Sequence, residues 1–452
     1  MLSSTRLSRR QFLVACGAVG ASTALIACAP AAPAAPAGGG EAASSDAAAA
    51  PAPASEAGGI TFLIRSDIRS AYAGDAAAEA WNKDHEQKIT LDEPAGDVQA
   101  KIQASQAAGD LVWDGFAVIE GPWSIQSWVT RNMVQPLDDL IATSTIPNAD
   151  KVVPAIIPSV LESSKYEGKQ YTIPGNVGSV ALGWFTEPLA KAGVEPPQTW
   201  DEVRAAAEKI KESDDKITPY DVANVGLCDM MSMIWGATNK PLTDDGLVDW
   251  TGEASLSALK WLQAMVKDKL MPGTHADSFG NWLKGGTAIM SSFDVHGTLA
   301  QQTFGVDKAS TGINIRRKKD DAAAGCPFWL NGSVVLSGAK NPQGMADFFL
   351  WWFGPDNKAN GKQIATVAAK PAYQYTYDEF IKPDAAQQWQ LEGIELVRNS
   401  TPFPANLLWG VQNSVMAPWI EKAVNPDNNL SAEDAIAQAM EELKTEMEDM
   451  KQ

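Results

Sequence analysis

The 452-residue chain contains few histidines, and its basic residues are fewer than its acidic ones. The three histidines, His85, His275 and His296, form no His-x-x-x-His pair, and the sequence has no Gly-x-Ser-x-Gly motif and no phosphate-binding loop. Asp and Glu outnumber Lys and Arg by 55 to 36, which argues against nucleic acid as a partner. We therefore expect a protein that uses no metal ion or other cofactor.

Long hydrophobic runs are also scarce, and the run near the N-terminus covers only the 16 residues from Phe12 to Ala27. A membrane-spanning helix needs roughly 20 apolar residues, so a permanent transmembrane anchor is the weaker interpretation. The twin arginine Arg9-Arg10 precedes the run, which favours a removable export signal over residues 1–27. Leu25-Ile26-Ala27-Cys28 resembles the bacterial lipobox, so we expect lipidation at Cys28.

Residues 28–59 are nearly all Ala, Pro, Gly and Ser, a composition that cannot build a core and predicts a disordered tether. With a lipid anchor on Cys28, the chain is expected to be an exported periplasmic or cell-surface lipoprotein. Cysteine is scarce as well, because only Cys228 and Cys326 remain in the folded part. One disulfide between them and two buried free thiols are both compatible with the sequence.

The folded part is too long for a single hydrophobic core, so we expect roughly two lobes at about 150 residues each. From Ile60 onward, short β-like runs alternate with amphipathic helical stretches, which predicts an α/β fold. Strands are expected at 60–64, 88–91 and 116–119, and helices at 75–85 and 97–108, the second of which is expected to stop at Gly109. Two further helices are expected to begin with the caps Thr199 and Ser431.

Several sequence segments agree in order and spacing with one family. They are Tyr171-Thr172-Ile173-Pro174, Ala181-Leu182-Gly183-Trp184-Phe185, Leu189-Ala190-Lys191-Ala192-Gly193 and Pro196-Pro197-Gln198-Thr199-Trp200-Asp201-Glu202, with further matches at 285–290, 332–337, 346–350 and 431–436. The chain thus resembles the family-1 extracellular solute-binding proteins, which include the maltose- and other sugar-binding subunits of ABC importers. Phe185-Thr186 replaces the usual Tyr-Asn of that family, which puts the family's ligand contact there in doubt.

The resemblance implies a two-lobed periplasmic-binding-protein fold of type II, with the ligand cleft between the lobes. Three crossing segments would join the lobes at about 171–175, 325–331 and 376–383. The first lobe would comprise 60–172 and 332–378, and the second 173–331 and 379–452. The family also implies a monomer.

The function implied by the resemblance is capture of a sugar or oligosaccharide by lobe closure and delivery to an ABC permease. Glycerol phosphate, a polyamine or a peptide remains open as an alternative ligand. We expect no enzymatic activity, although a secreted glycoside hydrolase is a remote alternative, because its two carboxylates need no local sequence pattern.

Sixteen tryptophans against seven tyrosines suggest stacking surfaces, since an indole offers a flat apolar face and one N–H donor. Most are expected in the core, such as those at apolar helix positions. Six lie near loops, strand ends or family-like segments and are the candidates for ligand stacking: Trp123, Trp184, Trp235, Trp282, Trp329 and Trp409.

Polar ligand contacts are expected beyond the carboxyl ends of strands, where ligands bind in open α/β sheets. Carboxylates and amides can form paired hydrogen bonds with neighbouring sugar hydroxyls. The candidates are Arg65, Asp67, Arg69, Glu120, Asn176, Asp294 and Asn331.

Overall fold

The computed structural model describes residues 58–449, except 94–95, 224–229, 274–276, 312–313, 367–369, 385–386, 388 and 404–405. The export segment, Cys28, nearly all of the tether and Cys228 lie outside the described residues. No helix within the described part is both long and apolar enough to cross a membrane. The same residues hold no cluster of three or more His, Cys, Asp or Glu side chains that could bind a metal ion.

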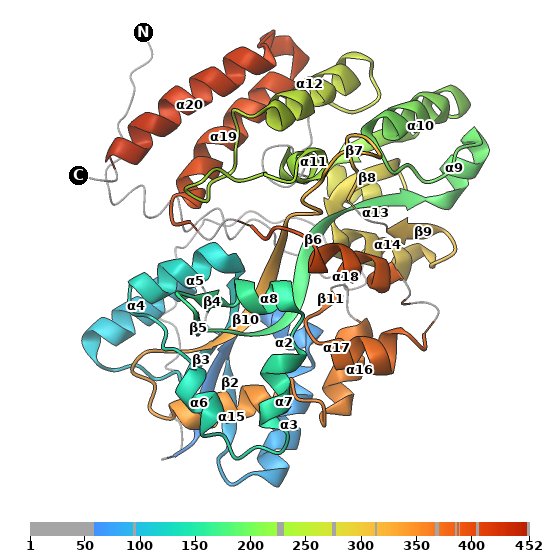
Figure 1. Cartoon of the computed structure of the whole chain (residues 1–452). Helices are drawn as coiled ribbons and strands as arrows, with labels where there is room; N and C mark the ends of the chain where they lie inside the picture. The colour runs from blue at the N-terminus through green and yellow to red at the C-terminus, as the bar shows by residue number, and fades with distance from the viewer. Residues whose placement is uncertain are drawn as a thin grey trace, which may run out of the picture.

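The first stretch of chain builds a group of elements in the lower half of Figure 1. Its elements are β1 (Ile60–Ile64), α2 (Ser66–Ala71), α3 (Gly74–Asp84), β2 (Ile89–Asp92), α4 (Val98–Ala108), β3 (Gly115–Glu120), α5 (Gly121–Thr130), α6 (Asp138–Ala142), α7 (Ala149–Val152), η1 (Val153–Ala155), α8 (Pro158–Ser163), β4 (Lys165–Tyr166) and β5 (Lys169–Gln170). The long strand β6 (Ile173–Phe185) then leads upward into a second group.

The second group contains α9 (Thr186–Ala192), α10 (Trp200–Ser213), β7 (Thr218–Val222), α11 (Met230–Ala237), α12 (Glu253–Lys267), α13 (Ser278–Leu283), β8 (Thr287–Phe293), α14 (Asp294–Phe304) and β9 (Ala309–Thr311). The chain returns to the first group through β10 (Phe328–Val335), α15 (Pro342–Trp352), α16 (Lys358–Thr366), β11 (Lys370–Pro371), α17 (Gln374–Thr376), the π-helical turn η3 (Tyr377–Ile381) and α18 (Trp389–Arg398). It ends in the second group with α19 (Trp409–Val424), η5 (Pro426–Asn428) and α20 (Ala432–Asp449).

The sheet runs in the order β2-β1-β3-β10-β6-β8-β7, with β9 and β11 also paired to β6. β1 is parallel to β2 and β3, whereas β10 is antiparallel to both β3 and β6. The first half of β6 pairs with β10 and β11, and its second half pairs with β8 and β9. A single strand therefore belongs to the sheets of both groups.

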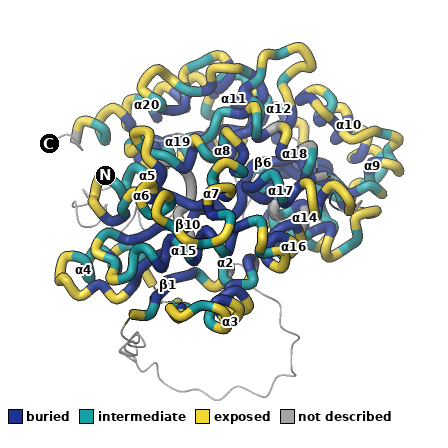
Figure 2. The backbone as a smooth tube through the Cα atoms, turned by 60° about the horizontal axis from the view of Figure 1, so that its bottom comes forward, coloured by how far each residue is buried: buried dark blue, intermediate teal, exposed yellow. Residues whose placement is uncertain are grey.

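Two large hydrophobic cores lie on either side of this shared strand. The first contains Val177, Cys326 and Val397, and the second contains Leu182, Ala324 and Phe403. The chain therefore passes between the cores at 177–182, 324–326 and 397–403. Figure 2 shows β1, β6 and β10 buried in the interior, with exposed residues concentrated on the outer helices.

The first and third passages lie later in the chain than the crossings expected at 171–175 and 376–383, and Ile173 and Val177 pack in the first core although the sequence interpretation placed residues 173–331 in the second lobe. Ile381, Ile394 and Val397 pack in the first core, although the sequence interpretation assigned residues 379–452 to the second lobe. The reason is that α18 packs against α8 and β11, and η3 packs against α16. Two elements that look like the start of the second lobe in the sequence thus complete the first.

Local predictions from side-chain chemistry agree with the structure. The Asp97 carboxylate accepts a hydrogen bond from Ala100 N at 3.0 Å, and α4 ends at Gly109, whose φ is 72°. Thr199 Oγ1 accepts from Glu202 N at 3.2 Å and Ser431 Oγ from Asp434 N at 3.0 Å, so both predicted caps are confirmed.

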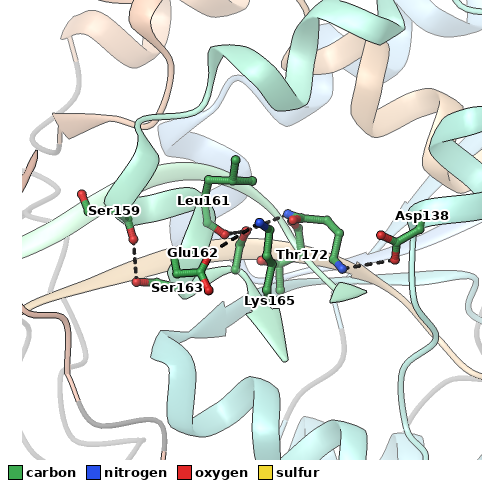
Figure 3. A network of polar contacts seen from close by, with 9 residues as sticks. Asp138, Ser159, Leu161, Glu162, Ser163, Lys165 and Thr172 are labelled. Carbon is green, nitrogen blue, oxygen red and sulfur yellow. Dashed lines mark hydrogen bonds and ion pairs between the residues drawn. The ribbon is translucent and has the colours of Figure 1, made fainter. Parts of the chain in front are cut away.

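A polar network fastens the segment that leads into β6 (Figure 3). The Ser163 hydroxyl donates to the Ser159 carbonyl at 2.8 Å, and Lys165 pairs with Glu162 at 3.4 Å. The Asp138 carboxylate accepts from the backbone N–H of Gln170 at 3.2 Å. The last of these bonds joins α6 to the end of β5, shortly before β6 begins.

Candidate functional site

Two of the predicted site residues meet where β6 and β10 cross from one lobe toward the other. Asn176 and Asn331 are partners in the β6–β10 register, and Asn331 Nδ2 donates to Asn176 Oδ1 at 3.0 Å. The Tyr72 hydroxyl donates to the same oxygen. The register of β10 shifts between Asn331 and Gly332, an irregularity that commonly re-aims a side chain beside a functional site.

The two amides keep one donor group and one acceptor available. Among the described residues, none pairs with the Asn176 amide nitrogen or with the Asn331 carbonyl oxygen. A hydroxyl group is both donor and acceptor, so this combination suits a polyhydroxylated ligand.

Trp329 lies two residues before Asn331 on β10 and therefore on the same face of the strand. Its partly exposed indole rests against Gly178, where an added Cβ would come within 2.4 Å of the ring. Phe293 and Phe403 contact it edge-on, with centroid distances of 5.3 and 5.5 Å. Gly178, Phe293 and Phe403 thus hold the indole ring in place at the junction, next to the two amides.

The aromatic contacts continue into the second lobe. Phe293 contacts His296 edge-on at 5.5 Å, and His296 stacks on Phe279 at 3.8 Å between centroids. Phe279, Phe293, His296 and Trp329 are all partly exposed. A row of rings therefore lies on the second-lobe side of the junction, and such a surface can stack against the apolar faces of flat ligands.

His296 is held in its neutral form. Burial lowers the pKa of its imidazole to about 4, because the surroundings disfavour the charged form. The ring interacts through Nδ1 with the Ser292 hydroxyl. A neutral imidazole can stack and form hydrogen bonds without adding charge to the junction.

The His296 pKa predicts an acid-sensitive stability. The unfolded imidazole binds a proton near pH 6.5 and the folded one only near pH 4, so the unfolded state gains protons first as pH falls. This group's contribution should be complete above pH 6.5 and be lost down to about pH 4, by up to roughly 3 kcal/mol. Urea unfolding of wild type and His296→Gln between pH 4 and 7 measures it. Identical pH slopes for the two proteins would contradict the prediction.

The Asp294 carboxylate pairs with a lysine inside the protein. This carboxylate is 2% exposed and forms an ion pair with Lys370, which is 3% exposed. Ser179 Oγ also donates to it at 3.3 Å, and Lys370 Nζ donates to Ser179 Oγ at 2.8 Å. The carboxylate that the sequence suggested as a ligand acceptor is therefore used within the protein.

Three of the six candidate tryptophans are core residues, which corrects the sequence interpretation. Trp235 is fully buried, and its indole N–H donates to the Thr401 carbonyl at 2.6 Å. Trp282 is 1% exposed and donates to the His296 carbonyl at 3.3 Å. Trp409 is 4% exposed and packs against Phe403. Since their surfaces are covered by protein, none of the three offers a face for stacking in this structure.

Of the other candidates, Glu120 has its backbone beside the amides, opposite Asn331 in the β10–β3 register. Trp184 is partly buried against the second core, in the half of β6 that pairs with β8 and β9. Arg69 forms an ion pair with Asp75, which occupies its guanidinium. Arg65 is partly buried at the start of α2. The side chains of Asp67, Glu120 and Trp123 lie outside the described residues.

Sequence reasoning missed Tyr72, Ser179, Phe293 and Lys370, which contact the predicted residues at the junction. Phe293 precedes Asp294 at the end of β8, so a strand-end rule could have found it. Lys370 and its carboxylate partner are 76 positions apart, and no local pattern connects them.

Two surface pockets lie outside the amide and indole cluster. A pocket of about 270 Å³ opens between η3 and α18 and is lined by Gln374, Tyr377, Lys382, Leu391, Ile394, Glu395 and Arg398. The other, of about 340 Å³, lies beside α11 and α12 and includes Asp249, Glu253, Arg317 and Asp321. Arg317 there bonds both Asp321 and Glu253, so its charge is compensated.

The family model of the bacterial extracellular solute-binding proteins matches residues 76–386, and the chain belongs to this family. A probable sugar-binding periplasmic protein of Rhizobium meliloti (strain 1021) is 32% identical over 123 residues. That match covers 27% of this chain and 26% of the relative, so the chain spans about a quarter of the length of that curated relative.

Solved structures of similar shape cover most of the chain. The cyclic alpha-maltosyl-1,6-maltose binding protein from Arthrobacter globiformis has a TM-score of 0.68 at 18% identity, over 85% of this chain and 98% of its own. The sugar-binding protein MalE from Xanthomonas citri has a TM-score of 0.70 at 14% identity, over 87% and 99%. These similarities confirm the predicted two-lobed fold.

Proposed function

We propose that this protein is the extracytoplasmic substrate-binding subunit of an ABC importer and captures a sugar or oligosaccharide. The observation that carries the proposal is the group formed by Trp329, Asn176 and Asn331 at the junction of the lobes. Family membership and the sugar-binding relatives support the same function.

The chemistry of this group fits a sugar ring. The exposed part of the Trp329 indole offers an apolar face for the C–H side of the ring, while the amides of Asn176 and Asn331 offer a donor and an acceptor for its hydroxyls. Binding of this kind needs no chemical step. The described ring contacts of the indole are with Phe293 and Phe403, both uncharged.

Closure of the lobes would complete the site. Asn176 is bonded by Tyr72 of the first core, whereas Trp329 packs against the second core beside Phe293. A ligand that contacts residues from both lobes binds better when they are close together, so it shifts the population toward the closed form. The closed form would then be the one delivered to the permease.

Calorimetry on the purified protein tests the ligand class. The panel contains maltose, maltotriose, mannobiose and mannotriose, together with glycerol 3-phosphate, spermidine and a tripeptide. We expect heat of binding with at least one saccharide and a smaller radius of gyration by X-ray scattering at saturation. Binding confined to the phosphate, the polyamine or the peptide would reject the sugar proposal.

We further propose twin-arginine export and a lipid anchor at Cys28. The support is the order of Arg9-Arg10, the apolar run and the lipobox-like segment. Several acyl chains give stable anchoring, whereas one holds a protein only reversibly.

A Cys28→Ala substitution in the full precursor should release the protein from the membrane fraction into the soluble fraction of a bacterial host. The reason is that the thiol carrying the lipid is lost. Fractionation followed by immunoblotting measures it, and Cys16→Ala in the same segment is the matched control, which should stay membrane-bound. Equal membrane retention of both variants would argue against lipidation at Cys28.

A further inference from the structure

The Lys370–Asp294 ion pair stands out by its burial. Both side chains are at most 3% exposed, whereas every other ion pair found among the described residues has at least one partner that is 21% or more exposed. Charges are rarely placed so deep without a partner, because removal from water is costly. Separating the two groups would leave each charge buried without a partner, so their contact is strongly favoured.

This pair joins the two lobes. Lys370 lies in β11 opposite Val177, the last residue of β6 in the first core. Asp294 begins α14, directly after Phe293, which lies opposite Val180 in the half of β6 that belongs to the second lobe. Ser179, between these two positions, bonds both members of the pair.

The other two passages between the cores reach the same place. Cys326, at the end of the second passage, bonds the Ser400 hydroxyl of the third passage through its backbone N–H at 2.9 Å. The backbone N–H of Thr401 also donates to the Ala324 carbonyl at 3.0 Å. Burial raises the pKa of the Cys326 thiol to about 11, against the opposing effects of the nearby Lys370 ammonium and of hydrogen bonds with Ser400 and Ser179. One buried polar cluster, here called the hinge cluster, thus contains Ser179, Asp294, Cys326, Lys370 and Ser400.

Glycines keep this cluster closely packed. Gly325 adopts a φ of +90°, and a Cβ there would lie 1.9 Å from Ser400 Oγ. Gly393 in α18 leaves room for the Lys370 side chain, since a Cβ there would lie 2.3 Å from its Cε. Backbone of the second passage therefore packs directly against Ser400, and backbone of α18 packs directly against the Lys370 side chain.

We propose that the hinge cluster, centred on the Lys370–Asp294 pair, sets the relative orientation of the lobes in the ligand-free protein. A rotation that separates β11 from α14 would leave two buried charges without partners, so the pair favours the lobe arrangement that keeps them together. The cluster thereby regulates how readily the site of the proposed function closes. Only this effect on closure of the site rests on the proposed function, whereas the effect on lobe orientation does not.

The test uses the full-length protein without ligand. Donor and acceptor dyes are attached through unnatural amino acids at the exposed Ala107 of α4 and Ala205 of α10, one on each lobe. Single-molecule energy transfer then reports the distribution of distances between the lobes. The key variant is Lys370→Met with Asp294→Asn, which removes both charges at nearly constant volume. Its matched control is Lys191→Met with Asp214→Asn, a surface pair with a 2.8 Å contact.

Wild type and control should share one distance distribution. The key variant should shift or broaden this distribution. We expect the population of a minor lobe arrangement, which two-state proteins hold at roughly 0.1–10%, to rise about tenfold. Ser179→Ala serves as a second, milder variant and should move the distribution in the same direction, so an unfolded double variant does not end the test.

If Ser179→Ala and any folded form of the double variant both give the wild-type distribution, the proposal is wrong and the pair has only a structural role. Since no ligand is present, a failure of the sugar proposal in calorimetry leaves this outcome unaffected.

Discussion

Replacing Lys370 alone by methionine is expected to lower the free energy of unfolding by about 3 to 5 kcal/mol. The substitution leaves the Asp294 carboxylate, which is 2% exposed, without its cationic partner. An uncompensated buried charge costs far more than a surface ion pair is worth. Equilibrium unfolding in urea measures the difference.

The control for this prediction is Lys191→Met. Lys191 and Asp214 also form an ion pair, but their side chains are 52% and 34% exposed. Exposed pairs contribute only about 0–1 kcal/mol, so the control should unfold near the wild-type midpoint. A Lys370→Met protein as stable as the control would mean that the two buried groups are not paired as the structure shows.

Replacing Trp329 by alanine is expected to weaken binding of the sugar found by calorimetry by about 30-fold or more. A central tryptophan in a binding site typically contributes at least about 2 kcal/mol, which corresponds to that factor in Kd. Because Trp329 is only partly buried, the loss of folding stability should be smaller than for a core tryptophan. Calorimetric titration of the variant gives the Kd.

Two companion variants separate the role of this ring from general damage. Trp419 is another partly exposed tryptophan, whose N–H donates to Glu442 at 2.8 Å on the outer helices α19 and α20, so Trp419→Ala should bind sugar normally. In Gly178→Ala the tryptophan is retained, but the added methyl group would clash with its indole and displace the ring from β6. This variant should therefore weaken binding, as Trp329→Ala does. Wild-type affinity in both Trp329→Ala and Gly178→Ala would show that the indole does not contribute to sugar binding.

Local elements were predictable because their causes are local. The cap at Thr199 and the helix stop at Gly109 depend on residues within one turn, and the structure agrees at both positions. The third passage was misplaced because the packing of Ile394 and Val397 against the first core involves elements far away in the sequence. Only the fold decides which core receives such a segment.

The candidate site was predictable in part. Asn176 follows the crossing expected at 171–175 and Asn331 is the last residue of the crossing expected at 325–331. The structure places both inside strands, with Asn331 Nδ2 3.0 Å from Asn176 Oδ1. The tryptophans could not be sorted, because Trp235 and Trp329 both stand in apolar surroundings along the sequence, while the structure buries one completely and leaves the other partly exposed. Lys370 carried no signal, since its partner comes from another lobe.

The position of β10 in the sheet has a consequence for synthesis of the protein. β10 lies between β3 and β6, yet it follows β6 in the chain only after all of α9 to β9. At about 5–20 residues per second, a ribosome needs roughly 7 to 30 seconds to make the segment between β6 and β10. During that time the facing edges of β3 and β6 lack their permanent partner, and unpaired edges invite association with other chains. The edges of β3 and β6 in the nascent first lobe therefore stay unpaired until β10 has been synthesised and inserts between them.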